Sequence, residues 1–196
     1  MDTNMLTQIA MGIALSACAG FRVFLPMLTA ALATQLGWIH LPSDMHWLGS
    51  WAAIICFGTA AILEVIAYYI PFVDNLLDTI ATPLSVAAGT MLAFSILPVG
   101  EQEPLIRWGL ALLAGGSAAG TIQLGTGILR LLSSKTTAGT GNAIVATTEN
   151  AAAASGSVLS LFIPVIMAVL LLFLIVWILV KLFSKVSSIS RKKGSI

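Results

Sequence analysis

Long stretches without a charged residue are the feature that most constrains this chain. Only 9% of its 196 residues are charged and 58% are hydrophobic, whereas an average soluble domain is about 25% charged and about 45–50% apolar. This small number of charges cannot cover the surface of a soluble globule of this size. The composition therefore indicates a membrane protein and excludes a soluble enzyme or a disordered chain. The net charge of +1 provides no basic surface for nucleic acid.

Five runs are long and apolar enough to cross a bilayer as helices, which requires about 20 residues each. They are residues 6–36, 47–70, 79–100, 108–129 and 151–180.

A sixth and weaker segment, residues 142–155, is rich in alanine and carries Glu149. As a helix it would span about 21 Å, which is less than the hydrocarbon core of about 30 Å. The segment is therefore expected to be a short tilted helix or a re-entrant piece.

The distribution of basic residues favours six membrane elements over five. Five of the 9 basic residues lie in residues 181–193, and cytoplasmic segments are enriched in Lys and Arg. With this end in the cytoplasm, five crossings would place Arg130 and Lys135 outside, whereas a sixth element brings them inside and moves Glu101 and Glu103 outside. We therefore predict an all-α polytopic integral membrane bundle of about six membrane elements, five strong spans plus one short or re-entrant, with both termini cytoplasmic.

The chain is predicted to form one transmembrane helical domain over residues 1–186, followed by a basic cytoplasmic tail, residues 187–196. Residues 12–20 resemble residues 109–117, because both open a long segment rich in small residues. Six elements thus permit a three-plus-three arrangement of inverted halves, a common transporter design. The simpler explanation is that small residues recur in any membrane helix.

Arg22 is the sharpest functional signal, because it is the only charge in the first apolar run. A charge at the bilayer centre costs about 2.5–3.5 kcal/mol on insertion scales, and such residues usually face the bundle interior or a cavity. Gly20 permits close backbone approach, and Pro26 removes a backbone donor. One interpretation is a broken helix whose opened backbone and Arg22 face an anionic solute or lipid phosphate. The other is a long tilted helix with Arg22 snorkelling to an interface.

The acidic residues near the second apolar run are candidate proton or cation ligands. Glu64 is either such a site or an interfacial carboxylate bonded to a neighbouring helix, and its depth argues against an ion pair with Arg22 unless the first segment is broken. Pro71 ends one helix or starts the next. Asp74 and Asp78, one helical turn apart, either join Glu64 around a cation or, as the favoured interpretation, cap helix starts.

Small residues form stripes at helical spacing in the first and fourth runs. The members are Gly12, Ser16 and Gly20 in the first, and Gly116, Gly120, Gln123 and Gly127 in the fourth. Such stripes let membrane helices pack closely. The alternative is that the smooth faces line a narrow path with Gln123 as its polar contact.

The loop that precedes the second run holds His40, Asp44 and His46, a combination that can bind a metal. A commoner explanation is that Ser43 or Asp44 caps the second helix. We predict no metal site and no cofactor.

Three stretches of the sequence resemble a known family. The first is residues 19–26. The second is Leu63 and Glu64 with residues 70–74, and the third is Glu149 with Asn150. They resemble a bacterial family of small polytopic membrane proteins catalogued as domain of unknown function 4126, over most of residues 5–183. The family tends to have an acidic pair where this chain has Glu149 and Asn150. The resemblance implies a multi-pass protein of the bacterial inner membrane and no particular activity.

These observations predict a small secondary transporter or channel for a small solute or lipid headgroup. Arg22 would contact an anionic group, and Glu64 or Glu149, beside Asn150, would handle a proton or cation. No catalytic triad or metalloprotease arrangement is present in the sequence, so an enzyme is the least favoured reading. The alternative is a non-catalytic membrane module that packs against a partner protein or a second copy of itself through the small-residue stripes. The lipid bilayer is the expected environment, and nucleic acid is not an expected partner.

Overall fold

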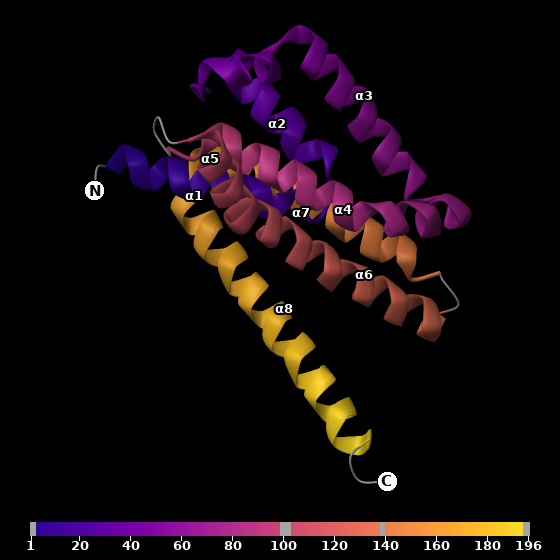
Figure 1. Cartoon of the computed structure of the whole chain (residues 1–196). Coiled ribbons are helices and arrows are strands. Elements are labelled where there is room, and N and C mark those ends of the chain that lie inside the picture. Colours follow the sequence, from indigo (N-terminus) through magenta and orange to yellow (C-terminus); the bar gives the residue numbers. More distant parts are fainter. Residues whose placement is uncertain (1–2, 99–102, 138–139, 194–196) are drawn as a thin grey trace.

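In the computed structural model, every regular element among the described residues is a helix, which confirms the all-α prediction (Figure 1). It describes the backbone of residues 3–98, 103–137 and 140–193, with side chains except those of residues 3, 71, 72, 74, 75, 78 and 185–193. The elements are α1 (Thr3–Cys18), α2 (Phe24–Gln35), η1 (Ser43–Gly49), α3 (Trp51–Ala67), α4 (Pro71–Ile96), α5 (Pro104–Ala111), η2 (Leu112–Gly116), α6 (Ser117–Thr137), α7 (Asn142–Phe162) and α8 (Pro164–Lys193).

Three of the described helices are long and apolar enough to cross a membrane. They are the part of α4 over Thr79–Ile96, the composite helix α5–η2–α6 over Pro104–Thr137, and α8 over Pro164–Ser184. A fourth candidate is the pair η1 and α3, which is bent by 56°. The structure thus agrees with a helical membrane protein.

The first apolar run folds into two short helices joined by a turn. The helix α1 has 16 residues and α2 has 12, about 24 and 18 Å long. Gln8 near the start of α1 and His40 beyond the end of α2 line the same pocket. Both ends of the run therefore lie at one end of the molecule, and the run is a helical hairpin. This agrees with the interpretation of a broken helix and contradicts that of a single long tilted helix.

The helix is interrupted between Cys18 and Phe24, before Pro26 rather than at it. Pro26 lies in the first turn of α2, where a missing N–H costs little because helix-start donors have no partner within the helix. Gly20 lies in the turn, and a Cβ there would meet the carbonyl oxygen of Ala119 and come within 2.7 Å of the Cβ of Ile122. The hairpin tip can therefore press against α6 because residue 20 has no side chain.

The composite helix of α5 and α6 carries a π-helical turn, η2, where it crosses α4. A Cβ on Gly115 would meet the carbonyl oxygen of Gly89 and the side chains of Ala93 and Ser16. The Ser16 hydroxyl donates to the carbonyl of Gly89 at 2.8 Å. Small residues thus let α1, α4 and the composite helix approach closely.

The two segments that suggested an internal repeat have different structures. Residues 12–20 end α1 and enter the hairpin turn, whereas residues 109–117 run through the π-helical turn of a continuous helix. The weak sixth segment also differs from its prediction, because α7 has 21 residues, or about 31 Å of helix. The short helices therefore lie in the first apolar run, as α1 and α2, rather than in residues 142–155.

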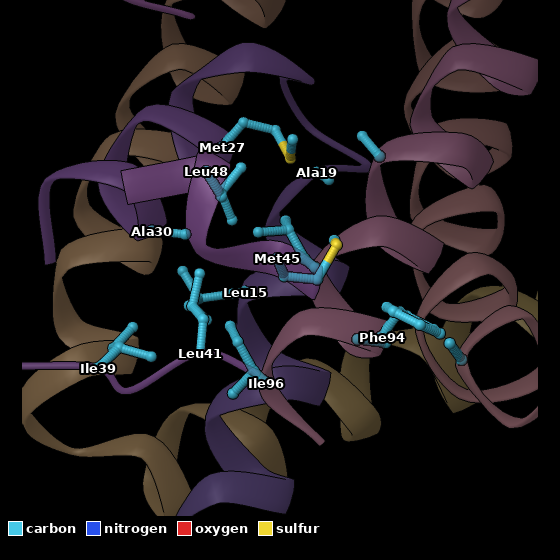
Figure 2. Close-up of a cluster of buried hydrophobic side chains, with 14 of the residues drawn as sticks. Leu15, Ala19, Met27, Ala30, Ile39, Leu41, Met45, Leu48, Phe94 and Ile96 are labelled. Atoms are coloured by element: carbon cyan, nitrogen blue, oxygen red, sulfur yellow. The ribbon is translucent and has the colours of Figure 1, made fainter. Parts of the chain in front are cut away.

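A buried apolar cluster holds the hairpin against its neighbours (Figure 2). It joins Leu15 of α1 and Met27 of α2 to Leu48 of η1 and Phe94 and Ile96 of α4. A second cluster joins α1 to α6 and α8, and its members include Ala14, Ile122, Met167 and Leu171. The hairpin is therefore packed on both sides and its tip lies at a fixed place.

The two ends of the bundle are distinct. The start of α1 lies at the opposite end from the α6–α7 connection, and α8 runs diagonally across the bundle (Figure 1). It remains helical to Lys193, so the helix continues into the residues predicted to form a tail. At the end where α1 starts, Ser50 caps α3 by accepting from the amide of Ala53 at 3.1 Å. The prediction of a cap at Ser43 or Asp44 was wrong, because these residues begin η1, which precedes α3.

Candidate functional site

Three charged side chains and a tyrosine, from four parts of the chain, meet at the hairpin tip. Arg22 lies in the turn between α1 and α2, Arg130 on α6 and Glu149 on α7, and they surround Tyr68 at the end of α3; we call these four residues the central cluster. Their exposed fractions are 2% for Arg22, 3% for Arg130, 4% for Glu149 and 5% for Tyr68. Glu64 is adjacent and 9% exposed.

Glu149 is held by both arginines. The Nη1 of Arg22 donates to Oε2 of Glu149 at 2.7 Å. The Nε of Arg130 donates to Oε1 at 3.2 Å, and its Nη2 donates to Oε2. Arg130 thus uses the two-pronged geometry that suits carboxylates and phosphates.

Arg22 also contacts the start of α7 and its own turn. Its Nε donates to Oδ1 of Asn150 at 2.5 Å, and its Nη1 donates to the carbonyl of Phe21 at 2.8 Å. Its Nη2 donates to the carbonyl of Ala146 at 3.3 Å. These contacts satisfy the donors of a guanidinium that is shielded from solvent, as burial of a charge requires.

Tyr68 contacts both guanidiniums through its ring. The Cζ atoms of Arg22 and Arg130 lie 3.8 and 4.1 Å from the ring centroid. Cation–π contacts stabilise a buried cation by about 2 kcal/mol when desolvated. The ring and the shared carboxylate together offset the repulsion between the two arginines.

Glu64 caps a helix to which it does not belong. Its Oε1 accepts from the amide of Val23 at 2.9 Å, and its Oε2 accepts from the amide of Phe24 at 3.0 Å. A carboxylate at this position complements the positive end of the α2 dipole. The interpretation of Glu64 as a carboxylate bonded to a neighbouring helix agrees with this contact. The depth argument that separated Glu64 from Arg22 does not apply, because the first segment is broken.

The central cluster holds two guanidiniums and one carboxylate, and Glu64 is engaged by backbone amides. Two guanidiniums therefore lie close together between α3, α6 and α7, with Glu149 as a carboxylate that contacts both. Buried ion pairs are seldom more stabilising than well-packed apolar residues of similar volume, so stability alone does not explain this arrangement. Chemically, two arginines that share one carboxylate can exchange it for another carboxylate or a phosphate.

The other predicted site residues add no described contact to the central cluster. Gln123 is buried on α6 and makes none of the contacts described above. Pro71 starts α4. The side chains of Asp74 and Asp78 lie outside the described residues, so the cation site and the caps predicted there stay predictions.

Most of the predicted packing residues contact neighbouring helices of the same chain. A Cβ on Gly12 would lie 3.3 Å from Leu97, and one on Gly116 would lie 2.5 Å from the hydroxyl of Thr90. A Cβ on Gly120 would lie 2.8 Å from Val86. Gly127 differs, because a Cβ there would have no neighbour within 4 Å among the described residues.

Sequence reasoning missed Arg130 and Tyr68 as members of the site. Arg130 was assigned to a loop, whereas α6 continues to Thr137. A usable signal was present, because position 130 lies seven residues after Gln123 and three after Gly127, on the face that the stripe already defined. Tyr68 carries no comparable signal, because an aromatic residue at a membrane helix end is ordinarily an interface anchor.

Comparison with known protein families identifies the chain. Residues 9–184 match the family described as Domain of unknown function (DUF4126). The chain belongs to this family. No curated protein and no solved structure matches it. The match spans every residue of the central cluster, which confirms the resemblance given by the sequence motifs.

Proposed function

We propose that this protein is a small secondary transporter or channel for an anionic solute or lipid headgroup, with Arg22 and Arg130 as the anion-binding pair. The observation that carries the proposal is the position of Glu149, whose carboxylate lies between two buried guanidiniums. A side-chain carboxylate in this place acts as an internal anion. A solute that carries a carboxylate, sulfate or phosphate group has the same chemistry and competes for the same donors.

Exchange of the internal anion gives a transport step. When a proton binds to an oxygen of Glu149, its charge is lost and the two guanidiniums attract a solute anion instead. When the anion leaves, the proton leaves Glu149 and the carboxylate returns to the arginines. Glu64 keeps the tip of the hairpin in place during this exchange, because it bonds the first amides of α2.

The proposed membrane arrangement has six elements, as predicted, but in a different order. The hairpin α1–α2 is re-entrant, and the η1–α3 pair, α4, α5–α6, α7 and α8 cross. The basic end of α8 and Lys135 then face the bacterial cytoplasm, in agreement with the positive-inside rule. In this arrangement α1 starts on the outer side, which replaces the cytoplasmic N-terminus expected from the sequence.

The alternative of a partner-binding module has weaker support. The small residues that suggested it are engaged within the chain at Gly12, Gly116 and Gly120. Gly127 is the member of the stripe that still offers an open surface. A partner or second copy would therefore pack near the α6 end, where the two functions can be separated by substitution.

Uptake into proteoliposomes that contain the full chain tests the transport proposal. The probes are radiolabelled sulfate and succinate, and a separate arm follows dithionite quenching of fluorescent phosphatidylglycerol to detect movement of a lipid headgroup. At least one probe is expected to move faster than in protein-free vesicles, and Arg130→Gln is expected to reduce that rate at least tenfold. Lys135→Gln is the matched control, because Lys135 is exposed on the same helix.

Two results would overturn the proposal. One is the absence of protein-dependent movement of all three probes. The other is a normal rate in folded Arg130→Gln protein. A pH-sensitive dye inside the vesicles adds a second readout, because uptake by Glu149→Gln protein is expected to carry no protons.

A further inference from the structure

A cavity with a polar rim lies at the end of the molecule where α1 starts. Its volume is about 260 Å³, just below the range of about 300–1,000 Å³ for small-molecule sites. Its lining residues come from α1, the loop after α2, the end of α4 and α5: Gln8, His40, Leu41, Pro42, Ser95, Ile96, Leu97, Pro98 and Arg107. We call this cavity the outer pocket.

Arg107 is the cation of the outer pocket, and its ring contact orients it. Its Cζ lies 4.2 Å from the centroid of the Phe94 ring, which in turn stacks on Trp108 at 4.2 Å. The guanidinium plane is thereby supported on one side, while its side chain is 15% exposed. An arginine held in this way is preorganised for a planar anion.

The polar contacts of Arg107 are long. Its Nη1 lies 3.5 Å from Oδ2 of Asp44, whose side chain is 50% exposed, and its Nη2 donates to the carbonyl of Phe94 at 3.4 Å. By contrast, Arg22 contacts Glu149 at 2.7 Å. Arg107 therefore keeps donor capacity for a further acceptor, and Asp44 is a weak competitor that solvent already surrounds.

The rest of the outer pocket is mostly apolar where it is deepest. Leu41 and Ile96 are buried, and both belong to the apolar cluster around the hairpin (Figure 2). The buried hydroxyl of Ser95 donates to the carbonyl of Met91 at 2.7 Å, so its proton is not available to a ligand. Exposed Gln8 and His40 form the polar rim.

We propose that the outer pocket binds a small organic monocarboxylate. The carboxylate bonds the guanidinium of Arg107 and displaces Asp44, while the apolar part of the ligand contacts Leu41, Ile96 and Leu97. One guanidinium matches one negative charge, and the apolar wall favours an organic acid over an inorganic anion. Binding here does not depend on transport through the central cluster, because the outer pocket shares no residue with it.

Equilibrium dialysis of the purified full chain in detergent tests the proposal with radiolabelled benzoate as the probe. Saturable binding of one benzoate per chain is expected. Unlabelled benzoate competes with the probe, whereas benzamide, which has the same ring and no charge, does not. Arg107→Gln is expected to weaken binding at least tenfold, and Lys135→Gln leaves it unchanged.

Asp44→Asn is the decisive second variant, because its site is exposed and the substitution keeps the fold. The loss of the competing carboxylate is expected to tighten benzoate binding severalfold. The proposal is overturned by an absence of saturable binding, by equal affinity for benzoate and benzamide, or by an Asp44→Asn protein that binds benzoate no more tightly than the original chain.

Discussion

Arginines occupy two sites in this protein that differ in their exposure to solvent. In the central cluster, Arg22 and Arg130 are almost fully buried and share Glu149, a carboxylate from α7. In the outer pocket, Arg107 is partly exposed and its nearest carboxylate, Asp44, lies 3.5 Å away on an exposed side chain. The same guanidinium chemistry is thus closed by the chain itself at one site and left open at the other.

This contrast sets what each site is expected to do without rearrangement. In the proposed account, an anion reaches Arg107 through an existing cavity and displaces a solvated competitor. An anion would reach Arg22 and Arg130 only when Glu149 leaves them, so binding there would be coupled to a change in the charge of Glu149 or the position of α7. Coupled transport requires a buried site such as the central cluster, whereas simple binding requires only an open site such as the outer pocket.

Removal of one arginine from each site gives the largest expected contrast. Arg130→Gln leaves Glu149 with one of its partners and is expected to cost about 3–5 kcal/mol, as for other broken buried pairs. Arg107→Gln breaks a long and partly exposed pair and is expected to cost about 0–1 kcal/mol. Thermal unfolding in detergent, monitored by size-exclusion chromatography, measures the stability of both variants. Equal losses of stability would contradict the comparison.

The packing behind the central cluster gives the next contrast. A methyl group at Gly20 would collide with Ala119 and Ile122, whereas one at Gly127 would meet open space. Gly20→Ala is therefore expected to destabilise the folded protein by about 1–3 kcal/mol, as overpacking does. Gly127→Ala is expected to stabilise by about 0.8–1.0 kcal/mol through helix propensity. The same unfolding assay applies, and a tolerated Gly20→Ala would argue against the close approach of the hairpin tip.

The cap on α2 gives a smaller and local effect. Glu64→Gln keeps the size of the side chain but removes the charge that faces the amides of Val23 and Phe24. A loss of about 0.5–2 kcal/mol is expected from the weakened cap, with faster hydrogen exchange at the amides of residues 23–25. Glu103→Gln, at an exposed site before α5, is the control. Unchanged exchange at residues 23–25 would show that Glu64 does not hold the hairpin.

Addition of a carboxylate to the central cluster tests its charge with the smallest structural change. Asn150→Asp places a second anion at the Nε of Arg22, which now bonds the amide oxygen of Asn150. The added negative charge offsets the attraction of Arg22 and Arg130 for a solute anion, so slower sulfate or succinate uptake with unchanged or increased thermal stability is expected. Faster uptake would mean that the positive charge is not what attracts the solute.

Charge scarcity predicted much of the site but not its full membership. Arg22, Glu64 and Glu149 stand out because each is isolated in apolar sequence, and the structure brings all three to the hairpin tip. Arg130 does not stand out, because the positive-inside rule explains a basic residue near Lys135 without any further role. A rule about average charge placement cannot distinguish a loop arginine from one that lies seven residues before a helix end.

The path of the first apolar run was not predictable from its hydrophobicity. A run as long as residues 6–36 fits one tilted span or two short helices equally well by length. The choice depends on tertiary contacts: Glu64 supplies acceptors for the first amides of α2, and Gly20 allows the turn to press on α6. Both contacts join residues that are distant in sequence, so the local sequence pattern does not predict them.

Chemical rescue of a truncated Glu149 tests most directly whether Arg22 and Arg130 can hold a solute anion in its place. Glu149→Ala removes the shared carboxylate and leaves room beside the two guanidiniums. In detergent, added acetate is expected to raise the unfolding temperature of this variant in a saturable way, as ligand binding to the folded state does, whereas acetamide has no effect and Lys135→Gln protein does not respond to acetate. An unfolding temperature of Glu149→Ala protein that acetate leaves unchanged, or raises no more than it raises that of Lys135→Gln protein, would contradict the account.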